Sequence, residues 1–137
     1  MNKIITGIGL LLQTPKGTFL FQERDKNTKR NPGMITPFGG GIDKGEAPVD
    51  CAVRELKEEL ELGITAKELK EVGIFQSHFD VKTYLQIYLI ENVNVGDLTL
   101  NEGKSIMELN ITDALNHPRV TNFTKEVLKV LETRRLH

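Results

Sequence analysis

Residues 38–62 read FGGGIDKGEAPVDCAVRELKEELEL and combine two features that decide the fold. The first is the glycine run at 39–41, which carries no β-carbon and lets the backbone approach a neighbouring group closely. The second is a helical pattern that starts at Pro48, because proline fits the first turn of a helix, where its missing N–H costs no hydrogen bond. This stretch therefore predicts a glycine-rich loop that enters a helix over 48–60.

Apolar residues set the rotation of the predicted helix. At about 100° per residue they form one stripe, which predicts contact with a core. Glu55, Glu58 and Glu59 fall together in an arc of about 100° beside this stripe, so the three carboxylates are predicted to be neighbours. The stripe itself consists of Val49, Ala52, Val53, Leu56 and Leu60.

Such a cluster of like charges is unfavourable near the end of a helix. Carboxylates one turn apart repel and also oppose the helix dipole, and each effect costs about 0.3–1 kcal/mol. A bound cation offsets that cost, and an all-oxygen donor set favours Mg²⁺, with Mn²⁺ as an alternative. Otherwise Glu58 and Glu59 are solvated surface, paired with Arg54 and Lys57. The histidines are isolated in the sequence and form no metal motif: His78, His117 and His137.

The segment 40–62 resembles the Nudix box, Gly-x5-Glu-x7-Arg-Glu-U-x-Glu-Glu-x-Gly-U, in which U is a bulky aliphatic residue. One defined position departs from that pattern, because Glu61 replaces the final glycine. Since this glycine commonly ends the helix, Glu61 is expected to lengthen the helix by a fraction of a turn, with Gly63 as the C-terminal cap. Because Glu59 lies two residues before Glu61, this change in the box could alter the position of the Glu59 carboxylate.

The remainder of the chain predicts a mixed α/β fold, because strand-like stretches lie on both sides of the helix. The resemblance implies more specifically a Nudix-type α/β/α sandwich with a mixed β-sheet. A length of 137 residues fits a single Nudix domain over 1–137. Strands are predicted at 4–12, 18–23, 72–79, 83–90 and 106–109, a loop at 27–33, and a final amphipathic helix at 121–135.

The resemblance implies an activity, the hydrolysis of a pyrophosphate bond in a nucleoside diphosphate linked to another group X. Metal ions lower the pKa of a bound water in such reactions and offset the charge that develops on the phosphate oxygens. By family analogy Glu55, Glu58 and Glu59 are metal ligands, and the Gly40 carbonyl is a further ligand. Arg54 is the residue that orients a neighbouring glutamate.

Two glutamates are candidates for the general base. Glu102 matches a later loop glutamate that many relatives use as a metal ligand or as the base. In the competing interpretation Glu102 is a turn residue beside Gly103, and Glu55 is the base. Glu46, near the start of the helix, is expected to support the loop and the helix start.

Candidate substrate-binding residues come from three parts of the chain. Gly39 and Gly40 let backbone groups approach a diphosphate. Arg24 follows a strand and either reaches a phosphate or belongs to the charged surface. Asn122 stands where the 8-oxo-dGTP diphosphatases of this family place a purine-reading asparagine, although Asn122 or Thr121 equally well caps the last helix. Three aromatic residues either stack on a base or belong to the core: Phe75, Phe79 and Tyr84.

Composition argues against several other classes of function. The formal net charge of −1 gives no overall attraction for a nucleic acid polymer or an anionic membrane. The single cysteine, Cys51, removes a disulfide framework and a thiolate zinc site and fits a reducing compartment, so a cytoplasmic location is expected. The apolar run 4–12 contains glycines and is too short to span a bilayer, which favours a strand over a signal peptide. Monomer and homodimer both stay open.

Three functions follow from these patterns. The first is an Mg²⁺-dependent hydrolase of a nucleotide, such as an altered nucleoside triphosphate, with nucleotide sugars or dinucleotides as alternative substrates. The second is a Nudix-fold regulatory module without catalysis, although such modules typically lose box carboxylates that are present here. The third is an unrelated α/β domain with an acidic helix, which the glycine loop disfavours. The absence of proline between Pro48 and Pro118 weakens the ADP-ribose and NADH pyrophosphatase branches.

Overall fold

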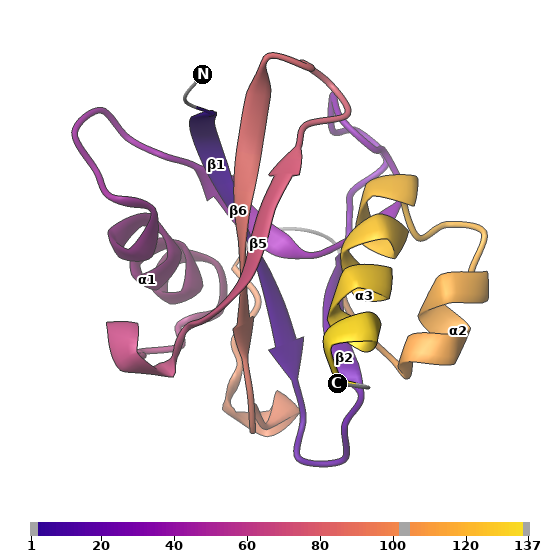
Figure 1. Cartoon of the computed structure of the whole chain (residues 1–137). Coiled ribbons are helices and arrows are strands. Elements are labelled where there is room, and N and C mark those ends of the chain that lie inside the picture. Colours follow the sequence, from indigo (N-terminus) through magenta and orange to yellow (C-terminus); the bar gives the residue numbers. More distant parts are fainter. Residues whose placement is uncertain (1–2, 102–104, 136–137) are drawn as a thin grey trace.

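The computed structural model describes residues 3–101 and 105–135, in which a seven-stranded mixed sheet lies between helices on both faces. Figure 1 shows α1 (Pro48–Leu60) on one side of the sheet. On the other side lie α2 (Ile111–Asn116) and α3 (Asn122–Arg135). The predicted α/β/α sandwich with a mixed sheet is therefore confirmed.

The sheet is arranged around its long first strand. Its main order is β3-β2-β1-β6-β5, while β4 also pairs with β1 and β7 with β2. Only the pair β1 and β6 is parallel among the described strand pairs, and the other pairs are antiparallel. The strands are β1 (Ile4–Gln13), β2 (Phe19–Glu23), β3 (Ile35–Thr36), β4 (Phe38–Gly41), β5 (Lys70–Gln76), β6 (Thr83–Ile90) and β7 (Ser105–Leu109).

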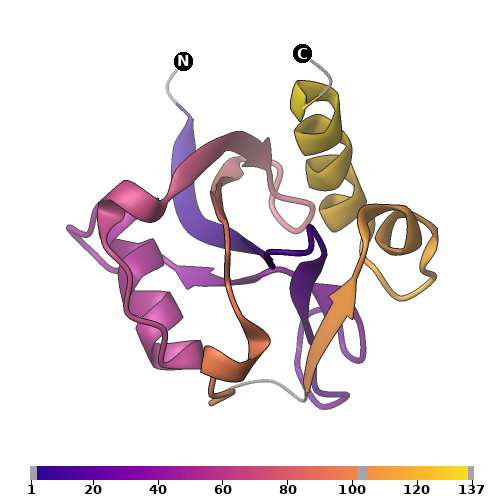
Figure 2. The same cartoon turned by 90° about the horizontal axis from the view of Figure 1, so that it is seen from below.

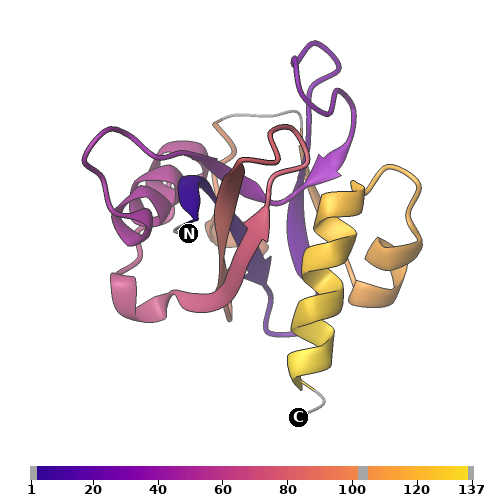
Figure 3. The same ribbon diagram turned by 45° about the horizontal axis from the view of Figure 1, so that its top comes forward.

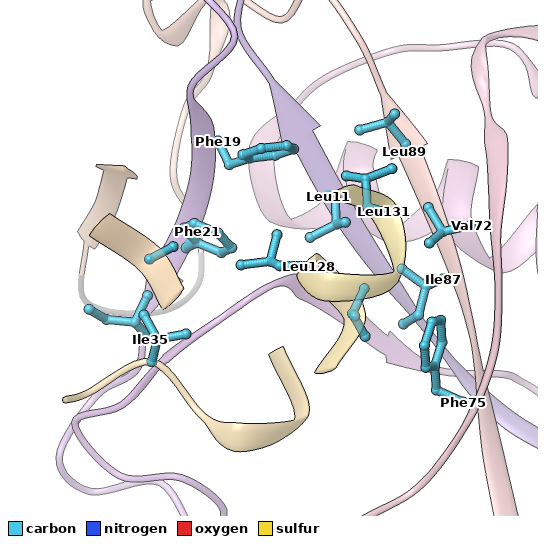
Figure 4. Close-up of a cluster of buried hydrophobic side chains, with 13 residues drawn as sticks. Leu11, Phe19, Phe21, Ile35, Val72, Phe75, Ile87, Leu89, Leu128 and Leu131 are labelled. Carbon is cyan, nitrogen blue, oxygen red and sulfur yellow. The ribbon is translucent and has the colours of Figure 1, made fainter. Parts of the chain in front are cut away.

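Alternation along β1 explains why both faces of the sheet are covered. Leu11 packs in the cluster under α3, whereas Leu10 and Leu12 pack in the cluster under α1, and all three are fully buried. Figure 4 shows the α3-side cluster, in which Leu128 and Leu131 of the helix meet side chains from several strands. Each helix is therefore held by an apolar face of the same sheet.

Most predicted elements are confirmed, and the differences have local causes. β5 ends at Gln76 rather than at residue 79, because the hydroxyl of Ser77 accepts hydrogen bonds from the N–H groups of Phe79 and Asp80 and starts a turn. The helix α2 was not predicted, although Asn110 caps it by accepting a bond from the Asp113 N–H at 2.7 Å. No described helix has the length and apolar character that crossing a membrane requires.

The expected extension of the box helix is wrong, and Gly63 is not its cap. The helix ends at Leu60, and Glu61 itself adopts the left-handed conformation with φ 53° and ψ 31°. The Leu62 N–H then donates to the Leu56 carbonyl at 3.2 Å. Because the Leu62 side chain packs against the α1-side core, the chain must turn at residue 61 whichever residue stands there.

Replacing Glu61 by glycine is expected to stabilise the fold by about 1 kcal/mol, which raises Tm by about 2–6 °C. A left-handed conformation costs a non-glycine residue about 1–2 kcal/mol, and the greater freedom of glycine in the unfolded chain offsets part of that gain. Calorimetric Tm values of the wild type and Glu61→Gly test the effect. Glu61→Ala retains the backbone strain and serves as the control; a Tm for Glu61→Gly no higher than that of Glu61→Ala contradicts it.

Candidate active site

The glycine strand β4 lies directly against a carboxylate of α1. β4 pairs with β1, with Gly40 opposite Ile8. A Cβ placed on Gly40 would lie 2.8 Å from Oε2 of Glu55 and closer still to its Oε1. Glycine is therefore required at residue 40 because the Glu55 carboxylate occupies the space that a side chain would need.

Arg54 ties the loop before α1 to the helix. Its Nε donates to Oε2 of Glu46 at 2.8 Å and its Nη2 to Oε1 at 2.9 Å, which is a bidentate pair. The Asp43 N–H donates to the same carboxylate at 3.0 Å. These bonds lower the pKa of Glu46 to about 2, and the hydrogen bonds from Arg54 contribute most to that shift. Glu46 thus lies in the position expected for a residue that supports the loop and the helix start.

The same guanidinium also contacts two of the predicted metal ligands. Nη1 of Arg54 donates to Oε1 of Glu55 at 3.1 Å and to Oε2 of Glu58 at 3.2 Å. The Glu55 side chain is 12% exposed, whereas that of Glu58 is 53% exposed. Arg54 therefore contacts one largely buried and one exposed carboxylate.

Glu55 and Glu59 form a pair of buried carboxylates one turn apart on α1. Burial is the main cause that raises the pKa of Glu55, and the charge of Glu58 acts in the same direction. Hydrogen bonds with Glu59 and Arg54 act in the opposite direction. The structure therefore concentrates acidic groups in a partly desolvated corner, where each added negative charge is costly.

The donors at this corner fit a hard divalent cation. The carboxylates of Glu55 and Glu59 beside Gly40 offer only oxygen, which suits Mg²⁺ or Mn²⁺ better than zinc or copper. Within residues 3–101 and 105–135, no three His, Cys, Asp or Glu side chains are already arranged around a common cation position. Glu58 would have to turn from Arg54 to join Glu55 and Glu59. Glu102 lies outside the described residues.

A cavity of about 520 Å³ begins at this corner and extends along the sheet. Gly39, Gly40 and Glu59 line one part of it, and Arg24 lines another. Asn122 is exposed at the start of α3, where its neighbours Thr121 and Phe123 line the cavity instead. Of the described candidate residues, Arg24, Gly39, Gly40 and Glu59 thus share one cavity, whereas its lining does not include Arg54, Glu55, Glu58 or Asn122.

Several cavity residues were not among the predicted substrate ligands. Arg30 lies over the ring of Phe79, with Cζ 4.6 Å from the ring centroid, and Arg24 Nε donates to the Arg30 carbonyl at 2.9 Å. Figure 3 shows the two loops that carry Arg30 and Phe79, after β2 and after β5, rising at the same end of the sheet. Gln22 and His78 also line the cavity. Of these four residues, only Phe79 had been singled out in the sequence as a candidate to contact a base.

Two open choices are settled by local contacts. Thr121 rather than Asn122 caps α3, since its hydroxyl accepts a bond from the Thr124 N–H at 3.3 Å. Of the three aromatic residues considered, Phe75 is buried in the α3-side core, whereas Phe79 is 54% exposed and lines the cavity. Tyr84 is partly buried, with the Lys3 ammonium 5.2 Å from its ring centroid. Phe79 is therefore the aromatic residue available to a ligand.

Comparison with known proteins gives two curated relatives. An uncharacterized Nudix hydrolase of Clostridium acetobutylicum is 32% identical over 83 residues, which is 56% of this chain and 40% of that protein. The m7GpppN-mRNA hydrolase NUDT17 of Xenopus laevis is 29% identical over 73 residues, 53% of this chain and 25% of that protein. The chain thus spans less than half the length of the curated relatives that it matches.

Among solved structures, the MutT protein of Methanosarcina mazei Go1 is similar with a TM-score of 0.80 and 16% identity. The match covers 100% of this chain and 99% of that one, which shows a shared fold. The family model described as the NUDIX domain matches residues 3–131, a range that includes β4, α1 and all residues that line the cavity. The glycine strand, the arginine and the paired carboxylates are thus parts of a known framework, and the chain belongs to the NUDIX domain family.

Proposed function

We propose that the chain is a metal-dependent hydrolase that cleaves a pyrophosphate bond in a nucleoside diphosphate linked to a group X. The observation that carries this proposal is the buried pair Glu55 and Glu59, of which Glu59 lines the cavity and Glu55 lies against Gly40 of the glycine strand. Buried acidic groups beside an open cavity are typical of functional sites rather than of a packed core. All box carboxylates are present, which argues against a module that has lost catalysis.

Glu55, Glu58, Glu59 and the Gly40 carbonyl would hold Mg²⁺, or Mn²⁺ in its place. When bound, the cation lowers the pKa of a water and offsets charge on the phosphate oxygens. Arg54 holds Glu55 through Nη1, whereas Glu58 would leave its bond to the same nitrogen in order to join the cation. Either Glu55 or Glu102 takes the proton of the attacking water on a carboxylate oxygen.

The favoured substrate is an altered nucleoside triphosphate of the 8-oxo-dGTP type, cleaved to the monophosphate and pyrophosphate. A cavity of about 520 Å³ is of the size that holds a small ligand such as a nucleotide. Phe79 offers an exposed ring for a base, Arg24 a cation for a phosphate, and Asn122 an amide at the margin. Nucleotide sugars, dinucleotides and, from the name of the Xenopus relative, capped nucleotides are the alternatives. A crystal structure with a bound nucleotide tests these contacts.

We further propose that this protein acts on small molecules in the cytoplasm and binds neither a nucleic acid polymer nor a membrane. The net charge of −1 supports the absence of a polyanionic partner. Cys51 is buried, and burial raises the pKa of its thiol to about 12, so this thiol is protonated and unreactive.

The activity is tested by release of phosphate or pyrophosphate from a nucleotide panel, with Mg²⁺ and with excess EDTA. We expect EDTA to lower turnover at least about a hundredfold, because the cation would lower the pKa of the attacking water and offset the negative charge on the phosphate oxygens. Adding Mg²⁺ back should restore the rate. A protein that cleaves no nucleotide in the panel and binds neither Mg²⁺ nor Mn²⁺ contradicts the proposal and favours a regulatory module.

A further inference from the structure

The C-terminal turn of α1 carries two of the candidate ligands, Glu58 and Glu59. The last four carbonyl groups of a helix have no partner within the helix. One of them, the Lys57 carbonyl, accepts the Glu61 N–H at 3.0 Å. The carbonyls of Glu58, Glu59 and Leu60 therefore need donors from elsewhere in the chain.

A segment far along the sequence supplies these donors. Nδ2 of Asn101 donates to the Glu58 carbonyl at 3.0 Å across a separation of 43 residues. The backbone N–H of the same asparagine donates to the Glu59 carbonyl at 2.8 Å, and the Thr99 N–H donates to the Leu60 carbonyl at 3.0 Å. Figure 2 shows the chain after η2 (Val95–Asp97) lying against this end of α1. The last turn is thus fully bonded, and Asn101 bonds both ligand-bearing residues.

These bonds act on the part of the helix where carboxylates are most costly. The C-terminal end of a helix carries the equivalent of about half a negative charge, which resides on its terminal carbonyls. The two N–H groups of Asn101 that donate to the carbonyls of Glu58 and Glu59 reduce the negative potential at this end of the helix. They also hold the backbone of the turn, from which both carboxylates project. Since the Asn101 side chain is exposed, core packing does not account for its placement.

We infer that Asn101 is a positioning residue for the cation site: its side-chain amide holds the last turn of α1 so that Glu58 and Glu59 are presented to a divalent cation, an inference that rests on the proposed function. Groups that support metal ligands from behind typically contribute about 10- to 100-fold to metal affinity or activity. Asn101→Ala removes the bond to Glu58 and keeps the backbone bond to Glu59. Asn101 would then matter for the cation although it is not among the residues that line the cavity.

The test compares Asn101→Ala with Thr99→Ala. Mn²⁺ binding to the nucleotide-free protein is measured by titration calorimetry, together with kcat, KM and the Tm in EDTA. We expect Asn101→Ala to bind Mn²⁺ about tenfold more weakly and to lower kcat about tenfold, with KM changed less than about twofold. Thr99→Ala is the matched control, because Thr99 bonds Leu60 through its backbone, and it should behave as the wild type.

A merely structural role predicts a different result, in which the Tm in EDTA falls while Mn²⁺ affinity and kcat of the folded protein are unchanged. That result overturns the inference. Should Asn101→Ala prove too unstable to assay, Asn101→Ser carries the same expectation, because serine suits a turn but is too short to reach the Glu58 carbonyl. A wild-type protein that neither binds Mn²⁺ nor hydrolyses any nucleotide overturns the proposed function as well. A wild type that does both, matched by Asn101→Ala, overturns the inference alone.

Discussion

Glu59→Gln is expected to lower kcat at least about a hundredfold at saturating Mg²⁺ while the fold is retained. Glu59 lines the cavity and is 5% exposed, so its carboxylate lies at the boundary between the core and the ligand space. Glutamine has nearly the same shape, so the substitution removes a charge without leaving a cavity. Steady-state kinetics of the two proteins with the same nucleotide give the comparison.

The metal-free protein provides the second measurement for Glu59→Gln. Removing one charge from the pair relieves repulsion with Glu55, so the Tm in EDTA should be unchanged or slightly higher. Glu61→Gln removes a charge from an exposed neighbour outside the cavity and should leave kcat unchanged. Normal turnover of Glu59→Gln would show that Glu59 is not a ligand. A large fall in its Tm in EDTA would instead assign Glu59 a structural role.

The box helix and the neighbouring carboxylates were predictable because they depend on local periodicity and on a motif with fixed spacing. The exact rotation of the helix was not. Val49 and Val53, assigned to the apolar stripe, are only partly buried, whereas Glu55 and Glu59 are buried. The sequence periodicity weighs apolar residues only, but α1 also packs on the glycine strand β4, which leaves room for carboxylates on that side.

Features that depend on distant residues escaped prediction. The bonds from Asn101 to the end of α1 join segments 43 residues apart, and a polar residue in a loop gives no sign of its partner. The contact of Arg30 with Phe79 joins loops that follow different strands. The short strand β3 and the helix α2 are too brief for a periodic pattern. The end of the helix at Glu61 was also not predicted. The packing of Leu62 against the core fixes the turn there, and the sequence pattern does not reveal that contact.

Gly40→Ala is expected to lower kcat by at least about a hundredfold, because misplacing a catalytic group by about 1 Å costs on that order. The new Cβ would lie 2.8 Å from Oε2 of Glu55 and closer to Oε1, so this carboxylate must move away from β4. Oε1 of Glu55 also accepts a hydrogen bond from Nη1 of Arg54 at 3.1 Å, and moving the carboxylate would disturb that bond. Kinetics at saturating Mg²⁺ and the Tm in EDTA measure the two consequences.

Gly41→Ala is the matched control for Gly40→Ala, since both changes remove a glycine from the same strand. A Cβ on Gly41 would meet only the Thr6 carbonyl oxygen, at 3.9 Å, which is an ordinary contact, and this variant should retain kcat within about threefold.

Combining Gly40→Ala with Glu55→Ala tests why glycine stands at residue 40. If the glycine serves to make room for the carboxylate, Gly40→Ala lowers Tm in the wild type and has little further effect on Tm once Glu55 is truncated, which is the non-additivity expected of two groups in contact. Equal losses of Tm in both backgrounds would instead mean that residue 40 is glycine for the pairing of β4 with β1, and the spatial link between the glycine strand and the catalytic helix would be lost.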